Sequence, residues 1–165
     1  MNKRGHVLNA VLLVLGLAII LEPSLSVDTG TRVAQLFVPV VLGALFPDVD
    51  TAFGRHRKTL HNLPVLAVFL AYPVVFGNLQ FVWIGVATHY VLDVLGSKRG
   101  IALLYPWDRE FNLPIGVSTS SDWAGVVTVA ITAVELAVLA AVHLYLVPLD
   151  ANVAPVETAR MAIGV

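Results

Sequence analysis

The chain lacks cysteine and contains few charged residues. None of its 165 residues is cysteine, and only 13% are Asp, Glu, Lys or Arg. The absence of cysteine excludes disulfide bonds, a thiolate nucleophile and sulfur ligands, so any bound metal must use nitrogen and oxygen ligands. The formal net charge of -1 provides no general attraction for nucleic acid, and we expect no nucleic-acid partner.

Apolar residues dominate the composition instead. They make up 58% of the chain, with a mean hydropathy of +0.84, whereas soluble domains contain about 45 to 50% apolar and about 25% charged residues. Apolar segments cover 8–21, 33–46, 63–76, 81–95 and 124–147. We therefore predict an all-α, polytopic membrane bundle of about five helices, with the lipid bilayer as its main partner. A span needs about 20 apolar residues, which the second and third segments reach only with their flanks.

The basic residues indicate how these helices are oriented. If the N-terminus is cytoplasmic, only Arg32 and Arg160 of the ten basic residues fall outside. The cytoplasmic ones are Lys3, Arg4, Arg55, Arg57, Lys58, Lys98, Arg99 and Arg109. This asymmetry follows the positive-inside rule and predicts a multi-pass protein of the plasma (inner) membrane.

The start of the chain has an alternative interpretation as a secretory signal. Lys3 and Arg4 precede an apolar run, and small residues at Ser24 and Ser26 offer a cleavage site. Cleavage would remove His6. We favour one membrane-embedded domain over residues 1–149, followed by an external tail over 150–165.

Histidines and aspartates gather at the predicted cytoplasmic face. They come from four separate stretches of the chain, and the topology that places them together rests on Lys and Arg alone. They are His6, Asp48, Asp50, His56, His61, His89 and Asp93. We predict that they form a metal site.

His89 and Asp93 are the most informative pair. They lie four residues apart on a predicted helix, which places their Cβ atoms about 5 to 6 Å apart on one face. Ionisable residues are costly within an apolar segment and are therefore functional candidates. The alternative is a buried hydrogen bond between the two side chains.

The other candidates lie at predicted helix ends. Asp48 and Asp50 follow a proline, and in extended backbone their two-residue spacing would point both side chains the same way. Alternatively, one of them caps the next element. His61 is expected to open the third helix and His6 the first, while His56 is either a ligand or a solvated loop residue.

Nitrogen and oxygen ligands suit Zn²⁺, Mn, Fe or Mg²⁺. A catalytic zinc uses about three protein ligands, so this set is large enough for two divalent ions. Glu135 lies in the middle of the last helix, where it could pair with a polar group or tune a cavity, and His143 is interpreted as an interface residue. The chain contains no G-x-S-x-G, P-loop or G-x-G-x-x-G motif.

Over its first two thirds, the chain resembles the YdjM-like family of inner-membrane-associated metal-dependent hydrolases. The matching elements are an early histidine, P-D-x-D, a histidine-arginine run ending in histidine, H-x-x-x-D, and glycine followed by L-L-Y-P. They correspond to His6, Pro47, Asp48, Asp50, His56, Arg57, His61, His89, Asp93, Gly100, Leu103, Leu104, Tyr105 and Pro106. Departures occur at Gly5, Lys58 and Asn62. The family in turn resembles zinc-dependent phospholipase C, which implies phosphoester chemistry by analogy.

The first functional hypothesis is a membrane-bound, metal-dependent hydrolase of a lipid or lipid-linked phosphoester, in which the metal activates water. Its metal ligands would be His6, Asp48, Asp50, His61, His89 and Asp93. His56 would be a further ligand or a proton shuttle. Arg57, or Lys98 and Arg99, would hold the phosphate, and the segment 96–114 would cover the site.

Two alternatives involve no catalysis. One is a membrane protein that binds or transports a cation, because ionisable residues lie within its spans. The other is a protein that recruits a partner through its basic loops.

Overall fold

The computed structural model describes residues 1–113 and 115–146, and this part of the chain is an all-α bundle of five α-helices and one short 3₁₀ helix. The prediction of an all-α helix bundle is confirmed. The predicted external tail, 150–165, lies outside the described residues, as do the last three residues of the predicted domain. The elements are α1 (Lys3–Leu21), α2 (Val27–Leu45), η1 (Pro47–Ala52), α3 (Leu63–Phe76), α4 (Val82–Gly96) and α5 (Ala124–Tyr145).

Two helices begin with side-chain caps. Ser26 Oγ accepts a hydrogen bond from Asp28 N at 3.1 Å, and Thr29 Oγ1 accepts one from Ser26 N at 3.1 Å. This capping box starts α2 at Val27, six residues before the apolar run, because it satisfies backbone N–H groups of the first turn. Asn62 caps α3 by accepting a hydrogen bond from Val65 N at 3.0 Å, and asparagine is among the residues preferred at this position.

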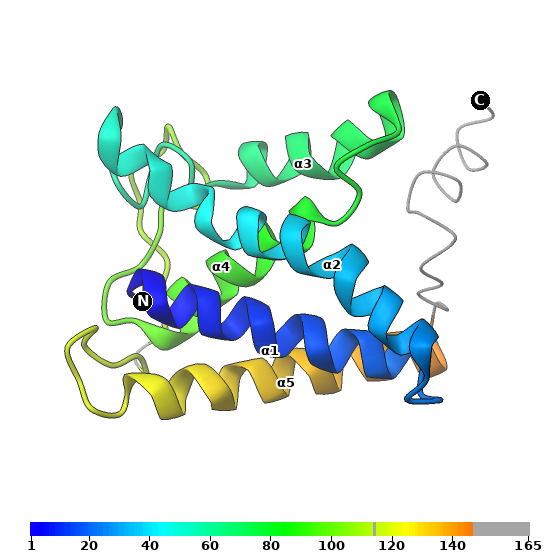
Figure 1. The fold of residues 1–165 in the computed structure, drawn as a ribbon. Coiled ribbons are helices and arrows are strands. Elements are labelled where there is room, and N and C mark those ends of the chain that lie inside the picture. The colour runs from blue at the N-terminus through cyan, green and yellow to red at the C-terminus, as the bar shows by residue number, and fades with distance from the viewer. Residues whose placement is uncertain (114, 147–165) are drawn as a thin grey trace.

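Helix α1 lies between α2 and α5, and α2 also crosses α4 (Figure 1). Helix α3 packs against α4. The largest buried apolar cluster joins α1 to α2 through Leu13, Val14 and Leu17 on the first helix and Leu36 and Val40 on the second. Close packing of these side chains holds α2 beside α1, because membrane helices associate through van der Waals contacts and not through removal of apolar area from water.

The backbones of α2 and α4 touch where two glycines meet. A Cβ atom on Gly43 would overlap the carbonyl oxygen of Val82, and one on Gly85 would overlap the carbonyl oxygen of Val40. Small residues permit such close crossings of membrane helices. The crossing brings the C-terminal end of α2 against the middle of α4, where His89 lies.

Within residues 1–113 and 115–146, three elements are long and apolar enough to cross a membrane: α1, the continuous segment Val27–Ala52, and α5. Helices α3 and α4 are apolar but have only 14 and 15 residues. Three of the five predicted spans therefore have the length that a membrane crossing needs. Helices α3 and α4 do not, and for α3 the apolar run in the sequence was already short.

The candidate residues lie at one end of the bundle. The start of α1, the end of α2, η1, the end of α4 and the start of α5 all lie at the end marked N in Figure 1. The loops 53–62, 97–113 and 115–123 lie at the same end. Backbone hydrogen bonds run from Ala102 N to Arg57 O at 3.0 Å, and from Leu63 N at the start of α3 to Leu103 O at 2.8 Å. The fold thus brings four separate stretches of sequence to one place.

Candidate metal centre

His61 and His89 are the centre of the site. Each is completely buried, and each ring uses Nδ1 to contact an acceptor. His89 Nδ1 lies 2.6 Å from the carbonyl oxygen of Ala44, an approach that the crossing of α2 and α4 permits. His61 Nδ1 lies 3.0 Å from Asp50 Oδ2. Since a carbonyl or carboxylate can only accept, both rings carry their proton on Nδ1 and direct the Nε2 lone pair into the site.

The two Nε2 atoms lie 3.0 Å apart and face two carboxylates. Asp48 Oδ1 lies 3.8 Å from each Nε2 atom. Asp93 Oδ2 lies 3.8 Å from that of His61 and 3.7 Å from that of His89. Two atoms bound to one tetrahedral zinc at about 2.0 to 2.1 Å lie about 3.3 to 3.4 Å apart. Each carboxylate oxygen therefore forms, with the two Nε2 atoms, a triangle close to the size that a divalent ion needs.

Burial also favours the metal-binding form of His61. It lowers the pKa of this imidazole below its ordinary value, although Asp50 and Asp93 oppose the shift. A neutral ring has the lone pair that a metal ligand needs. His61 is therefore ready to bind a cation at neutral pH.

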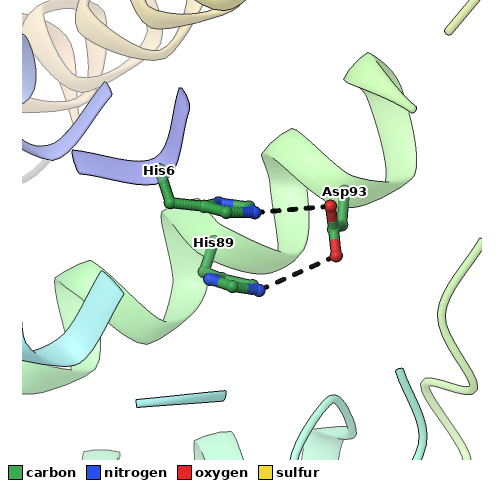
Figure 2. Close-up of side chains that lie close together, drawn as sticks. All are labelled: His6, His89 and Asp93. Atoms are coloured by element: carbon green, nitrogen blue, oxygen red, sulfur yellow. Dashed lines mark ion pairs between the residues drawn. The ribbon is translucent and has the colours of Figure 1, made fainter. Parts of the chain in front are cut away.

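His6 extends the site beyond these four side chains. Figure 2 shows His6, from the first turn of α1, and His89 side by side, with both rings directed at Asp93. The two rings are stacked with centroids 3.7 Å apart, and His6 Nε2 lies 3.5 Å from Asp93 Oδ1. Among the described residues, neither ring nitrogen of His6 has a hydrogen-bond partner, and neither has Asp93 Oδ2. Buried polar atoms normally have partners, so these atoms indicate a missing ligand.

The backbone around Asp50 differs from the extended conformation that the sequence predicted. Asp48 and Asp50 lie in the 3₁₀ turn η1 and not in extended backbone, so their side chains do not act as a matched pair. Both oxygens of Asp50 contact histidines: Oδ2 contacts His61, and Oδ1 contacts His56 Nδ1 at 2.9 Å. Oδ2 also accepts from Leu60 N at 3.3 Å. Asp50 thus contacts the Nδ1 side of both rings, away from the two facing Nε2 atoms of His61 and His89.

His56 lies at the edge of the site. Its side chain is 40% exposed, and its Nδ1 is 4.0 Å from Asp48 Oδ1. His56, Asp48 and His61 form a second group of side chains whose ligand atoms lie within 4.8 Å of one another. His56 is therefore neither a distant loop residue nor a buried one.

Arg57 does not face open space, contrary to the expectation that it holds a phosphate. Its guanidinium is buried, with Nη2 3.3 Å from Asp93 Oδ1 and Nη1 3.0 Å from Ser97 Oγ. Nη1 also donates to the carbonyl oxygens of Arg99 and Gly100. Arg57 therefore joins Asp93 to the loop after α4. The Met1 amine contacts the same Asp93 oxygen.

Tyr90 joins the two histidine-bearing segments. Its hydroxyl donates to the carbonyl oxygen of Leu60 at 2.5 Å and lies 3.2 Å from that of Asn62. These carbonyls flank His61, while Tyr90 follows His89 directly in α4. The loop that carries His61 is thus attached to the helix that carries His89.

Sequence reasoning missed a polar cluster beside the site. Asn9, Thr88, Thr132 and Glu135 form hydrogen bonds between α1, α4 and α5. The expectation that Glu135 pairs with a polar group is confirmed. The available signal was the spacing: Asn9 follows His6 by three residues, on the same helix face, and Thr88 precedes His89.

One comparison with known proteins identifies a family for this chain. No curated protein and no solved structure matches the chain. The family model described as YdjM inner membrane protein matches residues 1–154, which include every residue of the site. The chain belongs to the YdjM family of inner membrane proteins.

Proposed function

We propose that the protein is a membrane-bound, metal-dependent hydrolase of phosphoesters. The observation that carries this proposal is the pair of facing Nε2 lone pairs of His61 and His89, with Asp48 and Asp93 beside them. A divalent ion, of which zinc suits this donor set best, supplies the charge that activates water and stabilises the transition state.

The residues divide into ligands and groups that orient them. His61, His89, Asp48 and Asp93 bind the first ion. His6, whose ring nitrogens have no hydrogen-bond partner among the described residues, would be a further ligand beside His89 and Asp93, for this ion or for a second one. Asp50 holds His61 and His56 in place, and mutation of such supporting groups weakens metal binding about 10- to 100-fold.

His56 and the basic loop residues act on the substrate. His56 is close to Asp48 and partly exposed, so its ring can carry a proton between the site and solvent. Because the Arg57 guanidinium is used within the protein, contact with an anionic phosphate passes to Lys98 and Arg99, whose side chains are exposed on the loop after α4. No hydrogen bond or ion pair joins the Lys98 or Arg99 side chain to His61, His89, Asp48 or Asp93.

A lipid or lipid-linked phosphoester suits the surroundings of the site. Large apolar side chains are exposed in the loops at this end of the bundle, among them Phe53, Leu104, Trp107, Leu113 and Trp123. Tryptophans favour the membrane–water interface. The basic residues Lys3, Arg4 and Lys98 lie at the same end, so we infer that it faces the cytoplasm.

Cation transport is supported less well. It would need polar groups along a path across the bundle, and Glu135 was its mid-membrane candidate. Both carboxyl oxygens of Glu135 are engaged by Asn9 and Thr88. These contacts leave the carboxyl group less able to receive a passing ion.

The test uses full-length protein purified in detergent. Its metal content is measured by mass spectrometry, and its hydrolysis of phosphatidic acid and of a soluble phosphodiester is measured before and after chelation. We expect bound zinc and an activity that chelation abolishes and zinc restores. His89→Ala should lose both metal and activity.

His143→Ala is the matched control, since His143 lies in the last turn of α5, and that end of the helix is opposite to the end marked N (Figure 1). It should behave like the wild type. Metal-loaded protein without any hydrolysis, tested on both substrates, would reject the hydrolase and favour cation binding. Protein that is folded and binds no metal would reject the metal centre itself.

A further inference from the structure

Near the histidines, one carboxyl group is held inside the bundle by hydrogen bonds to two polar side chains. Glu135 of α5 has Oε2 2.7 Å from Asn9 Nδ2 of α1 and Oε1 2.7 Å from Thr88 Oγ1 of α4. Thr88 Oγ1 also lies 2.6 Å from Asn9 Oδ1. Asn9 Nδ2 makes a second hydrogen bond to Thr132 Oγ1 at 2.8 Å. Three helices thus meet at one closed group of contacts.

These contacts need one more hydrogen than the side chains would have if Glu135 were an ionised carboxylate. The Thr88 hydroxyl has one hydrogen but two oxygen neighbours at hydrogen-bond distance, Asn9 Oδ1 and Glu135 Oε1. The amide oxygen of Asn9 can only accept, so the Thr88 hydrogen must point to it. The contact between Thr88 Oγ1 and Glu135 Oε1 then requires a hydrogen on Glu135.

The alternative orientation of the Asn9 amide also requires a hydrogen on Glu135. If its oxygen and nitrogen exchange places, the amide oxygen lies 2.7 Å from Glu135 Oε2. Two acceptors at this distance again need a hydrogen between them, and only the carboxyl group can provide it. An ionised Glu135 would leave two oxygens in contact without a hydrogen, which is costly in a low-dielectric interior.

We propose that Glu135 is a proton-binding site: it holds a proton in the folded protein and, as a neutral acid, donates a hydrogen bond that joins α1, α4 and α5. Both oxygens of the acid are then used, one as donor to Thr88 and one as acceptor from Asn9. Thr132 completes the group by accepting from Asn9 and donating to Thr128 O at 2.8 Å. No charge is left inside the apolar segment.

The position of this group makes Glu135 a positioning residue for the metal centre. Asn9 lies one turn after His6 in α1, and Thr88 directly precedes His89 in α4. The hydrogen bonds therefore hold together the two helices whose histidine rings are stacked 3.7 Å apart. The proposal does not depend on hydrolysis, because the proton on Glu135 can be measured whether or not the protein has activity.

The test is an infrared difference spectrum between wild type and Glu135→Gln, both full length, in detergent at neutral pH. We expect the wild type to show the carbonyl stretch of a protonated carboxylic acid that Glu135→Gln lacks. Thr88→Val keeps the side-chain shape but removes the hydroxyl, and it should shift the frequency of this band. Carboxylate bands at Glu135 in place of the acid band would overturn the proposal.

The second measurement compares the stability and metal affinity of Glu135→Gln and Glu135→Ala. Glutamine can donate to Thr88 and accept from Asn9, as the neutral acid does, so Glu135→Gln should keep thermal stability and metal affinity within about twofold of wild type. Glu135→Ala removes both contacts and should lower the metal affinity at least tenfold. If Glu135→Gln instead fails to fold or behaves like Glu135→Ala, the negative charge is needed and the proposal is wrong.

Discussion

The Nε2 atoms of His61 and His89 lie 3.0 Å apart, and each presents a lone pair to the other. Their protons are on the opposite sides of the rings, where Asp50 and Ala44 accept them. Two lone pairs at this distance repel each other unless a cation lies between them or beside them. This relationship is the basis for the predictions that follow.

The first prediction concerns chelation. A cation that binds only the folded protein stabilises it by mass action, by about 2.7 kcal/mol when its free concentration is 100 times the Kd. Chelation should therefore lower the thermal unfolding midpoint of the wild type, and added zinc should restore it. The doubly substituted Asp48→Ala, His89→Ala protein should unfold at the same temperature with or without chelator. An equal decrease in both proteins would contradict a metal at this site.

The second prediction separates Asp50 from Asp48. Asp50 contacts two histidines, whereas Asp48 Oδ1 faces the two Nε2 atoms directly. Asp50→Asn should weaken zinc binding by about 10- to 100-fold, as expected for a group that orients a ligand. Asp48→Asn should weaken it by more than Asp50→Asn does. Competition with a zinc indicator measures both, and the reverse order would assign Asp50 as the ligand.

The third prediction concerns Arg57. Its side chain is buried against Asp93 and the loop after α4. Replacing it with Met leaves the Asp93 carboxylate without its guanidinium partner, and removal of one partner of a buried ion pair costs about 3 to 5 kcal/mol. We expect a lower unfolding midpoint even in chelator. Arg55→Met is the control, because the Arg55 side chain is 70% exposed and its ion pair with Asp108 is on the surface. A stable Arg57→Met protein with lost substrate affinity would restore the phosphate-binding role.

The fourth prediction tests the helix crossing that positions His89. A methyl group at Gly85 would overlap the backbone of α2, so Gly85→Ala should push α4 away from α2 and move His89 Nδ1 from Ala44 O. Both the unfolding midpoint and the zinc affinity should fall. Gly30→Ala is the matched control, since a Cβ atom at Gly30 meets nothing within 4 Å. Wild-type zinc affinity in Gly85→Ala would show that the crossing does not position the site.

The sequence indicated much of the site because its residues follow simple spacing rules. His89 and Asp93 are one helical turn apart, and their predicted shared face is observed, with Nε2 and Oδ2 3.7 Å apart. His6, Asp48 and His61 were placed with them by topology, and the structure brings all of them together. The apolar runs also predicted the number of helices.

Other features depend on contacts that spacing cannot reveal. The start of α2 lies among polar residues that resemble a loop, and only the cap at Ser26 shows that the helix begins there. The roles of Asp50 and Arg57 follow from the 3₁₀ turn and from the loop 97–100, whose positions depend on tertiary packing. The partners of Glu135 come from two distant helices, so no local pattern identifies them.

The attachment of Tyr90 to the loop around His61 has a consequence for ion selectivity. Because this hydroxyl ties the loop to α4 at the residue next to His89, it limits how far the two imidazoles can move apart when no ion is bound. A preorganised pair loses little conformational entropy on binding, but it cannot expand to accommodate a larger coordination shell. The site should therefore discriminate by ionic radius and accept small ions such as zinc in preference to calcium, whose longer bonds and six to eight oxygen ligands need a flexible cage.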